Sequence, residues 1–191
     1  MLRDARLKDP VQTRLLHVTS ASLATLVLLA VGAAPPASAD TTTASIEVTS
    51  GSLSISVPTS AGSLGTRANS VSGGSISGPL GQVQVNDARS AAAGATWTAS
   101  VISTAFTRVS PTAGPAIAAS AVSYAAGPIT KVGTATYAAQ DPSHLEGSIP
   151  AVTATGITGD NSATWNPTIT VAVPGGSPAG VYDATITHSV V

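Results

Sequence analysis

The chain has 191 residues, with eight basic and nine acidic side chains, a net charge of −1 and no cysteine. The lack of cysteine excludes disulfides and thiolate metal sites. Basic residues are sparse and form no patch, so no nucleic-acid partner is expected. Val, Ile and Thr are abundant, which argues against a disordered chain.

The first 39 residues have the three-part pattern of a secretory signal. Residues 23–34 form an uncharged apolar run, which is shorter than the ~20 residues of a membrane-spanning helix. Small residues then precede a predicted cleavage site between Ala39 and Asp40. A membrane anchor is the alternative interpretation. We expect export, no membrane span in the mature chain, and one domain over residues 40–191. The basic residues that open the signal are Arg3, Arg6, Lys8 and Arg14.

Short alternating runs predict strands in the first half of the mature chain, where straight-chain helix formers are nearly absent. Pro58 should end the second strand. Residues 59–79 are rich in Ser, Gly and Thr, which predicts a loop or a weak edge strand. A bend is expected at 90–94. The strands expected here are 44–48, 53–57, 82–85 and 96–101.

The second half of the mature chain has a weaker pattern up to residue 160 and a clear one after it. Residues 141–144 read as a turn. Over 182–190 every second residue is apolar or His188, so this run should bury one face. Further strands are expected near Phe106, Ile117, Val122 and Tyr124, and at 132–138, 152–157 and 169–173. Several strands joined by polar turns predict an all-β fold, an immunoglobulin-like antiparallel β-sandwich.

Two segments resemble the WxL cell-surface domain of Gram-positive bacteria and small secreted actinobacterial proteins related to it. Residues 80–89, LGQVQVNDAR, followed by Trp97, are similar to the family's LGxVxVxDxR strand and its first Trp-x-Leu. Residues 171–188 are similar to its last hairpin. Here Ala99 replaces the first Leu, and His188-Ser189-Val190 stands at the second motif. The resemblance implies a sandwich that binds peptidoglycan or another wall polymer non-covalently.

Three residues are candidates for wall binding, each with a structural alternative. Trp97 is either a stacking platform for wall sugars or, in a chain with few aromatic residues, a core residue. Trp165 precedes Asn166-Pro167 and is interpreted as either a core cap or an exposed side chain. His188 is either a pH-sensitive contact or a hydrogen-bonded histidine at the sandwich rim.

No motif marks a catalytic, cofactor or metal site. The chain has no G-x-S-x-G elbow, and no local pattern singles out a pair of carboxylates. His144, between Asp141 and Glu146, is expected in a solvated loop rather than on a metal. Asp160-Asn161 is a single pair, where a calcium loop needs several spaced oxygen ligands.

The sequence therefore predicts a secreted, non-catalytic sandwich, associated with the cell wall and binding wall polymer. An alternative is a structural or adhesion subunit that binds another surface protein through an exposed strand edge. A third hypothesis is a small secreted hydrolase.

Overall fold

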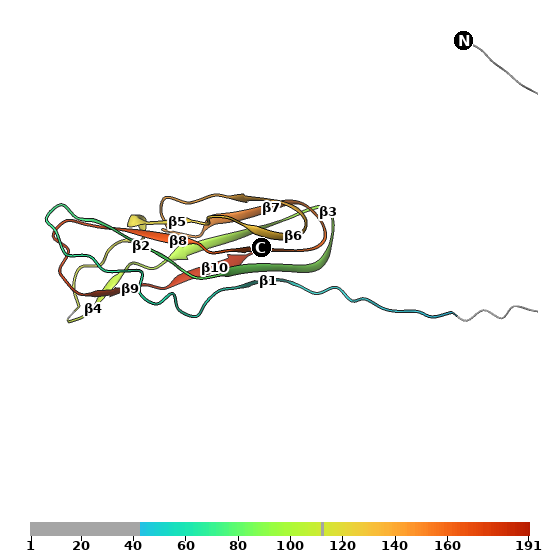
Figure 1. Ribbon diagram of the computed structural model, residues 1–191, viewed down its shortest axis with the longest axis horizontal. Coiled ribbons are helices and arrows are strands. Elements are labelled where there is room, and N and C mark those ends of the chain that lie inside the picture. The colour runs from blue at the N-terminus through green and yellow to red at the C-terminus, as the bar shows by residue number, and fades with distance from the viewer. Residues whose placement is uncertain (1–42, 112) are drawn as a thin grey trace, which may run out of the picture. The chain divides into compact units, whose positions relative to one another are not determined.

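The computed structural model describes residues 43–111 and 113–191. The predicted signal at 1–39 and its cleavage site lie outside these residues. Strands are the regular elements of the described chain, apart from one short 3₁₀ turn at Ala119–Ala121 (Figure 1). The strands are β1 (Leu53–Ser56), β2 (Gly74–Pro79), β3 (Val83–Ser103), β4 (Thr107–Ser110), β5 (Val122–Ala125), β6 (Thr130–Ala139), β7 (Ile149–Trp165), β8 (Thr168–Val173), β9 (Val181–Asp183) and β10 (Ile186–Val190).

The strands form antiparallel sheets that pack into a β-sandwich, which confirms the all-β prediction. The largest sheet has the order β1-β3-β7-β6, with β10 also paired to β3. A second sheet has the order β2-β8-β5, and β4 pairs with β9. The more specific immunoglobulin-like topology stays a prediction.

The β3–β7–β6 ribbon bends sharply, and we call this bend the corner (Figure 1). Register shifts interrupt the β3–β7 ladder between Asp87 and Trp97, and the β6–β7 ladder at the same level. Trp97 is the ladder partner of Ala154, yet its indole nitrogen is 3.2 Å from Asn161, seven residues further along β7. Seven residues of extended strand would keep these two positions apart. The contact of Trp97 with Asn161 therefore shows that β7 bends between Ala154 and Asn161.

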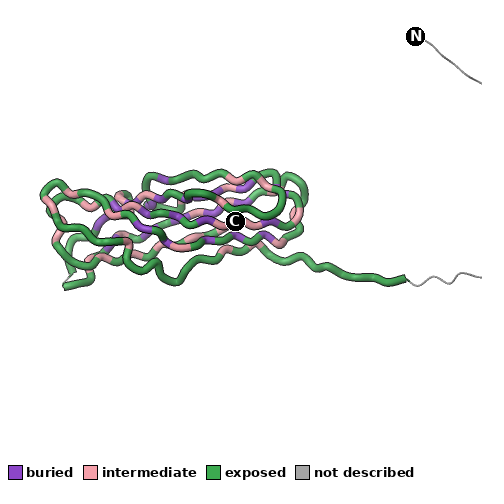
Figure 2. The backbone as a smooth tube through the Cα atoms, viewed as in Figure 1, coloured by how far each residue is buried: buried purple, intermediate pink, exposed green. Residues whose placement is uncertain are grey.

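Alternating apolar residues build the core, and the largest of them are Trp97, Trp165 and Tyr124; Figure 2 shows buried and exposed positions alternating along the strands. Over 181–190 the even-numbered residues are half-buried and the odd-numbered ones are exposed, as the pattern predicts. That run is divided into β9 and β10 rather than being one strand. Residues 83–85 and 96–101 are confirmed as strand but belong to one bent strand, β3, and Gln82 lies just before it.

Residues 44–48 are not a strand, so that prediction is wrong. The segment is exposed and no strand pairs with it among the described residues. An alternating sequence can form a strand only where the edge of another strand is available for backbone hydrogen bonds. Residues 59–73 are loop, and only 74–79 form an edge strand, β2.

Candidate functional site

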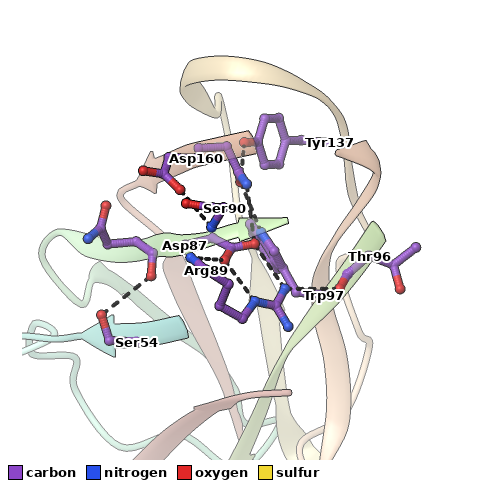
Figure 3. A network of polar contacts seen from close by, with 10 residues as sticks. Ser54, Asp87, Arg89, Ser90, Thr96, Trp97, Tyr137 and Asp160 are labelled. Carbon is purple, nitrogen blue, oxygen red and sulfur yellow. Dashed lines mark hydrogen bonds and ion pairs between the residues drawn. The ribbon is translucent and has the colours of Figure 1, made fainter. Parts of the chain in front are cut away.

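A buried carboxylate lies at the centre of the corner (Figure 3). Asp87 is fully buried and accepts two hydrogen bonds from the Arg89 guanidinium, at 2.7 Å from Nε and 2.9 Å from Nη2. The backbone N–H of Arg89 and the amide of Asn161 also donate to it. The Arg89 hydrogen bonds outweigh burial and hold the pKa of Asp87 below its usual value.

Asn161 connects this carboxylate to two aromatic rings. Its amide oxygen accepts hydrogen bonds from Trp97 Nε1 at 3.2 Å and from the Tyr137 hydroxyl at 3.0 Å. The two rings also contact each other, with centroids 5.6 Å apart. The polar atoms of the Asp87, Asn161, Trp97 and Tyr137 side chains therefore all bond within the fold, which is the pattern of a structural network.

The carboxylate of Asp160 also belongs to the corner. It accepts a hydrogen bond from the backbone N–H of Ser90, 2.8 Å away, where Ser90 has a positive φ of 52°. One oxygen of Asp160 and the amide oxygen of Asn161 are thus engaged by the chain. Across residues 43–111 and 113–191, no three His, Asp or Glu side chains converge on a metal position.

Both tryptophans are core residues. Trp97 is 1% exposed and Trp165 is 2% exposed. Trp97 therefore fits the core interpretation, and Trp165 caps the core rather than facing solvent. Neither ring offers an exposed face on which a sugar could stack in this fold.

His188 is half-buried on β10, in a chain of hydrogen bonds that begins at Trp165. Trp165 Nε1 donates to the Tyr124 hydroxyl at 2.7 Å, and that hydroxyl lies 3.3 Å from His188 Nε2. Because the Tyr124 oxygen accepts from an indole that can only donate, its own proton is free for the imidazole nitrogen. Burial lowers the pKa of His188 to about 4, so the ring is neutral at neutral pH.

A cleft of about 840 Å³ lies at the end of the sandwich away from the corner. One wall is the loop 57–73 and the other is the segment 174–186. The floor is apolar, and His188 lies beside it. The floor residues are Leu80, Val83, Phe106, Ile117 and Val171.

The loop 57–73 is attached to the body by few interactions. Leu64 packs on the core, and its backbone lies so close to Gly78 that a Cβ there would be 2.6 Å from the Leu64 oxygen. The Arg67 guanidinium donates to the backbone oxygens of Gly73 and Ser75. Among the described residues, no backbone hydrogen bond joins 57–69 to another part of the chain. The wall of the cleft is therefore polar and weakly held.

The structure does not bring the three predicted contacts into one site. Of Trp97, Trp165 and His188, only His188 lines the cleft. Sequence reasoning missed the cleft because its wall, 57–73, reads as an ordinary Ser- and Gly-rich loop. It also missed the partnership of Asp87 with Asn161, which lie 74 residues apart.

The remaining candidates are loop residues. Asp141 has a positive φ of 43° and accepts the backbone N–H of Ala126, which fits the predicted turn. His144 and Glu146 are exposed on the same loop.

No helix in the described part of the chain is long and apolar enough to cross a membrane. Comparison of the chain with family models, with curated proteins and with solved structures finds no match.

Proposed function

We propose that this chain is an exported, non-catalytic β-sandwich of the bacterial cell surface that holds a wall polymer in the cleft. The cleft is the observation that carries the proposal. Its volume of about 840 Å³ is that of a ligand site, and an apolar floor beneath a polar wall is the usual construction of such sites. Its loop wall supplies hydroxyl and backbone groups suited to a neutral, hydroxyl-rich ligand.

The resemblance to the WxL domain supports a wall ligand, but the residues that carry it lie at the corner. Asp87, Arg89 and Trp97 are joined in one network there. In this proposal they are the scaffold, and the ligand is held at the opposite end. The role of His188 is then to line the cleft as a neutral side chain.

Two of the titratable groups around the cleft, Arg67 and His188, are engaged within the fold. A general base must be free to reach a substrate proton. The Arg67 guanidinium bonds backbone oxygens, and His188 Nε2 is bonded to Tyr124. His188 Nε2 is therefore not free to accept a substrate proton.

Wall binding is tested by co-sedimentation of the purified chain with purified cell wall. Ala61 lines the cleft and is exposed, with no side-chain hydrogen bond to lose. Ala61→Trp should fill the cleft and abolish sedimentation with the wall. Ala93→Trp places the same ring on an exposed position of the corner and should sediment as the parent does. Equal binding by both variants would exclude the cleft.

Export is tested separately, by mass spectrometry of protein recovered from the culture medium. The expected N-terminus is Asp40, because Ala37, Ser38 and Ala39 provide the small side chains that a signal peptidase accepts. Recovery of a chain that still contains residues 23–34 would contradict this.

A second candidate function is that of a structural subunit joined to a protein partner through a strand edge. The observation in its favour is β6, a ten-residue outer strand that pairs on one side only. An edge of this length is a template for an added strand.

A further inference from the structure

We propose that residues 46–50 of one copy of this chain add as a strand to the free edge of β6 in a second copy. This rests on the second candidate function and names its partner. The donor is the segment that precedes β1. Ile46 is 92% exposed and Val48 is 85% exposed, with Glu47 between them. Large apolar side chains in a strand-like pattern, without a neighbour among the described residues, are suited to pairing with another edge.

The acceptor edge carries a lysine in an unusual position. Lys131 is the ladder partner of Ala163, which is buried, so its side chain starts on the inner face of the sheet. A charge there disfavours the addition of an apolar strand and favours a strand that brings a carboxylate. No ion pair engages Lys131 in the described part of the chain.

One register satisfies both the charge and the apolar side chains. If Glu47 lies opposite Lys131 in an antiparallel pair, Ile46 lies opposite Val132, because successive side chains alternate between faces. Val132 is 67% exposed on the outer face. The pairing therefore covers exposed apolar surface on both partners and joins two unpaired charges.

The donor must come from another molecule because the chain's own segment is too short. Ile55, Val85, Ala163 and Lys131 form one row across the sheet. The free side of β6 is four strand spacings from β1, or about 19 Å. The N–H of Gly51 is bonded to Ala88, so Glu47 can reach only about 14 Å from that anchor.

Each copy holds one donor and one acceptor, so the association is head-to-tail and produces rings or linear chains. Sedimentation of the purified chain over increasing concentration should show the weight-average mass rising about twofold or more. Glu47→Lys alone and Lys131→Glu alone should each abolish the rise, and the double variant should restore it. Glu146→Lys makes the same charge change in an exposed loop and should associate as the parent does.

Cross-linking locates the contact, because the chain has no cysteine of its own. Ile46→Cys combined with Val132→Cys should give disulfide-linked dimers and larger species on oxidation. Val71→Cys combined with Val132→Cys is the matched control, since Val71 is 96% exposed in a loop, and it should give no disulfide-linked dimers on oxidation.

A parent chain that stays monomeric at every concentration overturns the inference, as does association that the double variant fails to restore. Residues 46–50 and β6 do not line the cleft, so these outcomes are independent of the wall-binding test. Charge variants that are monomeric but still bind cell wall would show that wall binding does not need association. Chains that associate but do not bind cell wall would support the strand pairing and contradict the wall-binding proposal.

Discussion

Buried polar groups at the two ends of the sandwich differ in how completely they are hydrogen-bonded. At the corner, the Asp87 carboxylate receives four hydrogen bonds, and Asn161 satisfies Trp97 and Tyr137. Near the cleft, His188 Nδ1 and Arg108 Nε are buried without a partner. Unpartnered buried groups cost stability, whereas a complete network fixes one geometry. The comparison indicates that the corner holds the fold, whereas the cleft end is the part to which we assign the proposed ligand.

The largest effect should come from removing the ring at the corner. Trp97→Ala deletes a buried side chain that also donates to Asn161, and we expect a loss of about 3–5 kcal/mol from the free energy of unfolding. Denaturant unfolding measures this directly. Val71→Ala, on a loop, is the control and should be nearly neutral. An unchanged unfolding midpoint for Trp97→Ala would show that the corner is not the stabilising region.

A pH-dependent effect should come from the cleft end. The folded pKa of His188 is lowered to about 4, below the value of about 6.5 expected in the unfolded chain. The unfolded state therefore takes up a proton first as pH falls, and stability declines between about pH 6.5 and pH 4, by up to about 3 kcal/mol. His188→Phe should remove this part of the decline. The same slope in parent and variant would exclude His188 as its origin.

Asp87 should act in a different pH window. Its folded pKa is lowered by Arg89, so the stability it contributes is present above the unfolded value of about 3.9 and is lost as pH falls below that. Asp87→Ala should cost about 2–3 kcal/mol at neutral pH, because it leaves the Asn161 amide and the Arg89 side chain without their acceptor. Unfolding curves at pH 7 and pH 3 measure both effects, and equal loss at the two values would contradict the account.

A smaller contrast should appear in proteolysis. Arg67 lies in the weakly held loop, while Arg89 is bonded to Asp87 and lies within β3. Trypsin should therefore cut after Arg67 well before Arg89 under native conditions, because loops open at a lower free energy than paired strands. Mass spectrometry of a digestion time course identifies the first site. A first cut after Arg89 would contradict the corner as the more stable end.

The sequence predicts the local pattern well and the corner poorly. Period-2 alternation is a property of neighbouring residues, so the half-buried face of 182–190 follows from the sequence alone. The bend depends on contacts such as that of Trp97 with Asn161, which are 64 residues apart. The length of β7 was underestimated because its small Ala, Thr and Gly residues give a weak signal.

The position of Trp165 could not be decided from sequence for a related reason. It stands next to Asn166-Pro167, which is compatible with either a core or a surface position. Trp165 is buried against the other sheet, where the hydroxyl of Tyr124 accepts the hydrogen bond of its indole N–H. Residues 44–48 illustrate the opposite failure, because a strand-like pattern did not find a partner within the chain.

The most direct test of the two-ended account measures stability and wall binding on the same two variants. Tyr137→Phe removes one hydroxyl from the corner network and should cost about 1 kcal/mol, which lowers the melting temperature by about 2–4 °C. It should sediment with cell wall as the parent does. Ala61→Trp should keep the parent melting temperature and lose wall binding. A corner variant that loses binding at full stability, or a cleft variant that binds normally, would contradict the account.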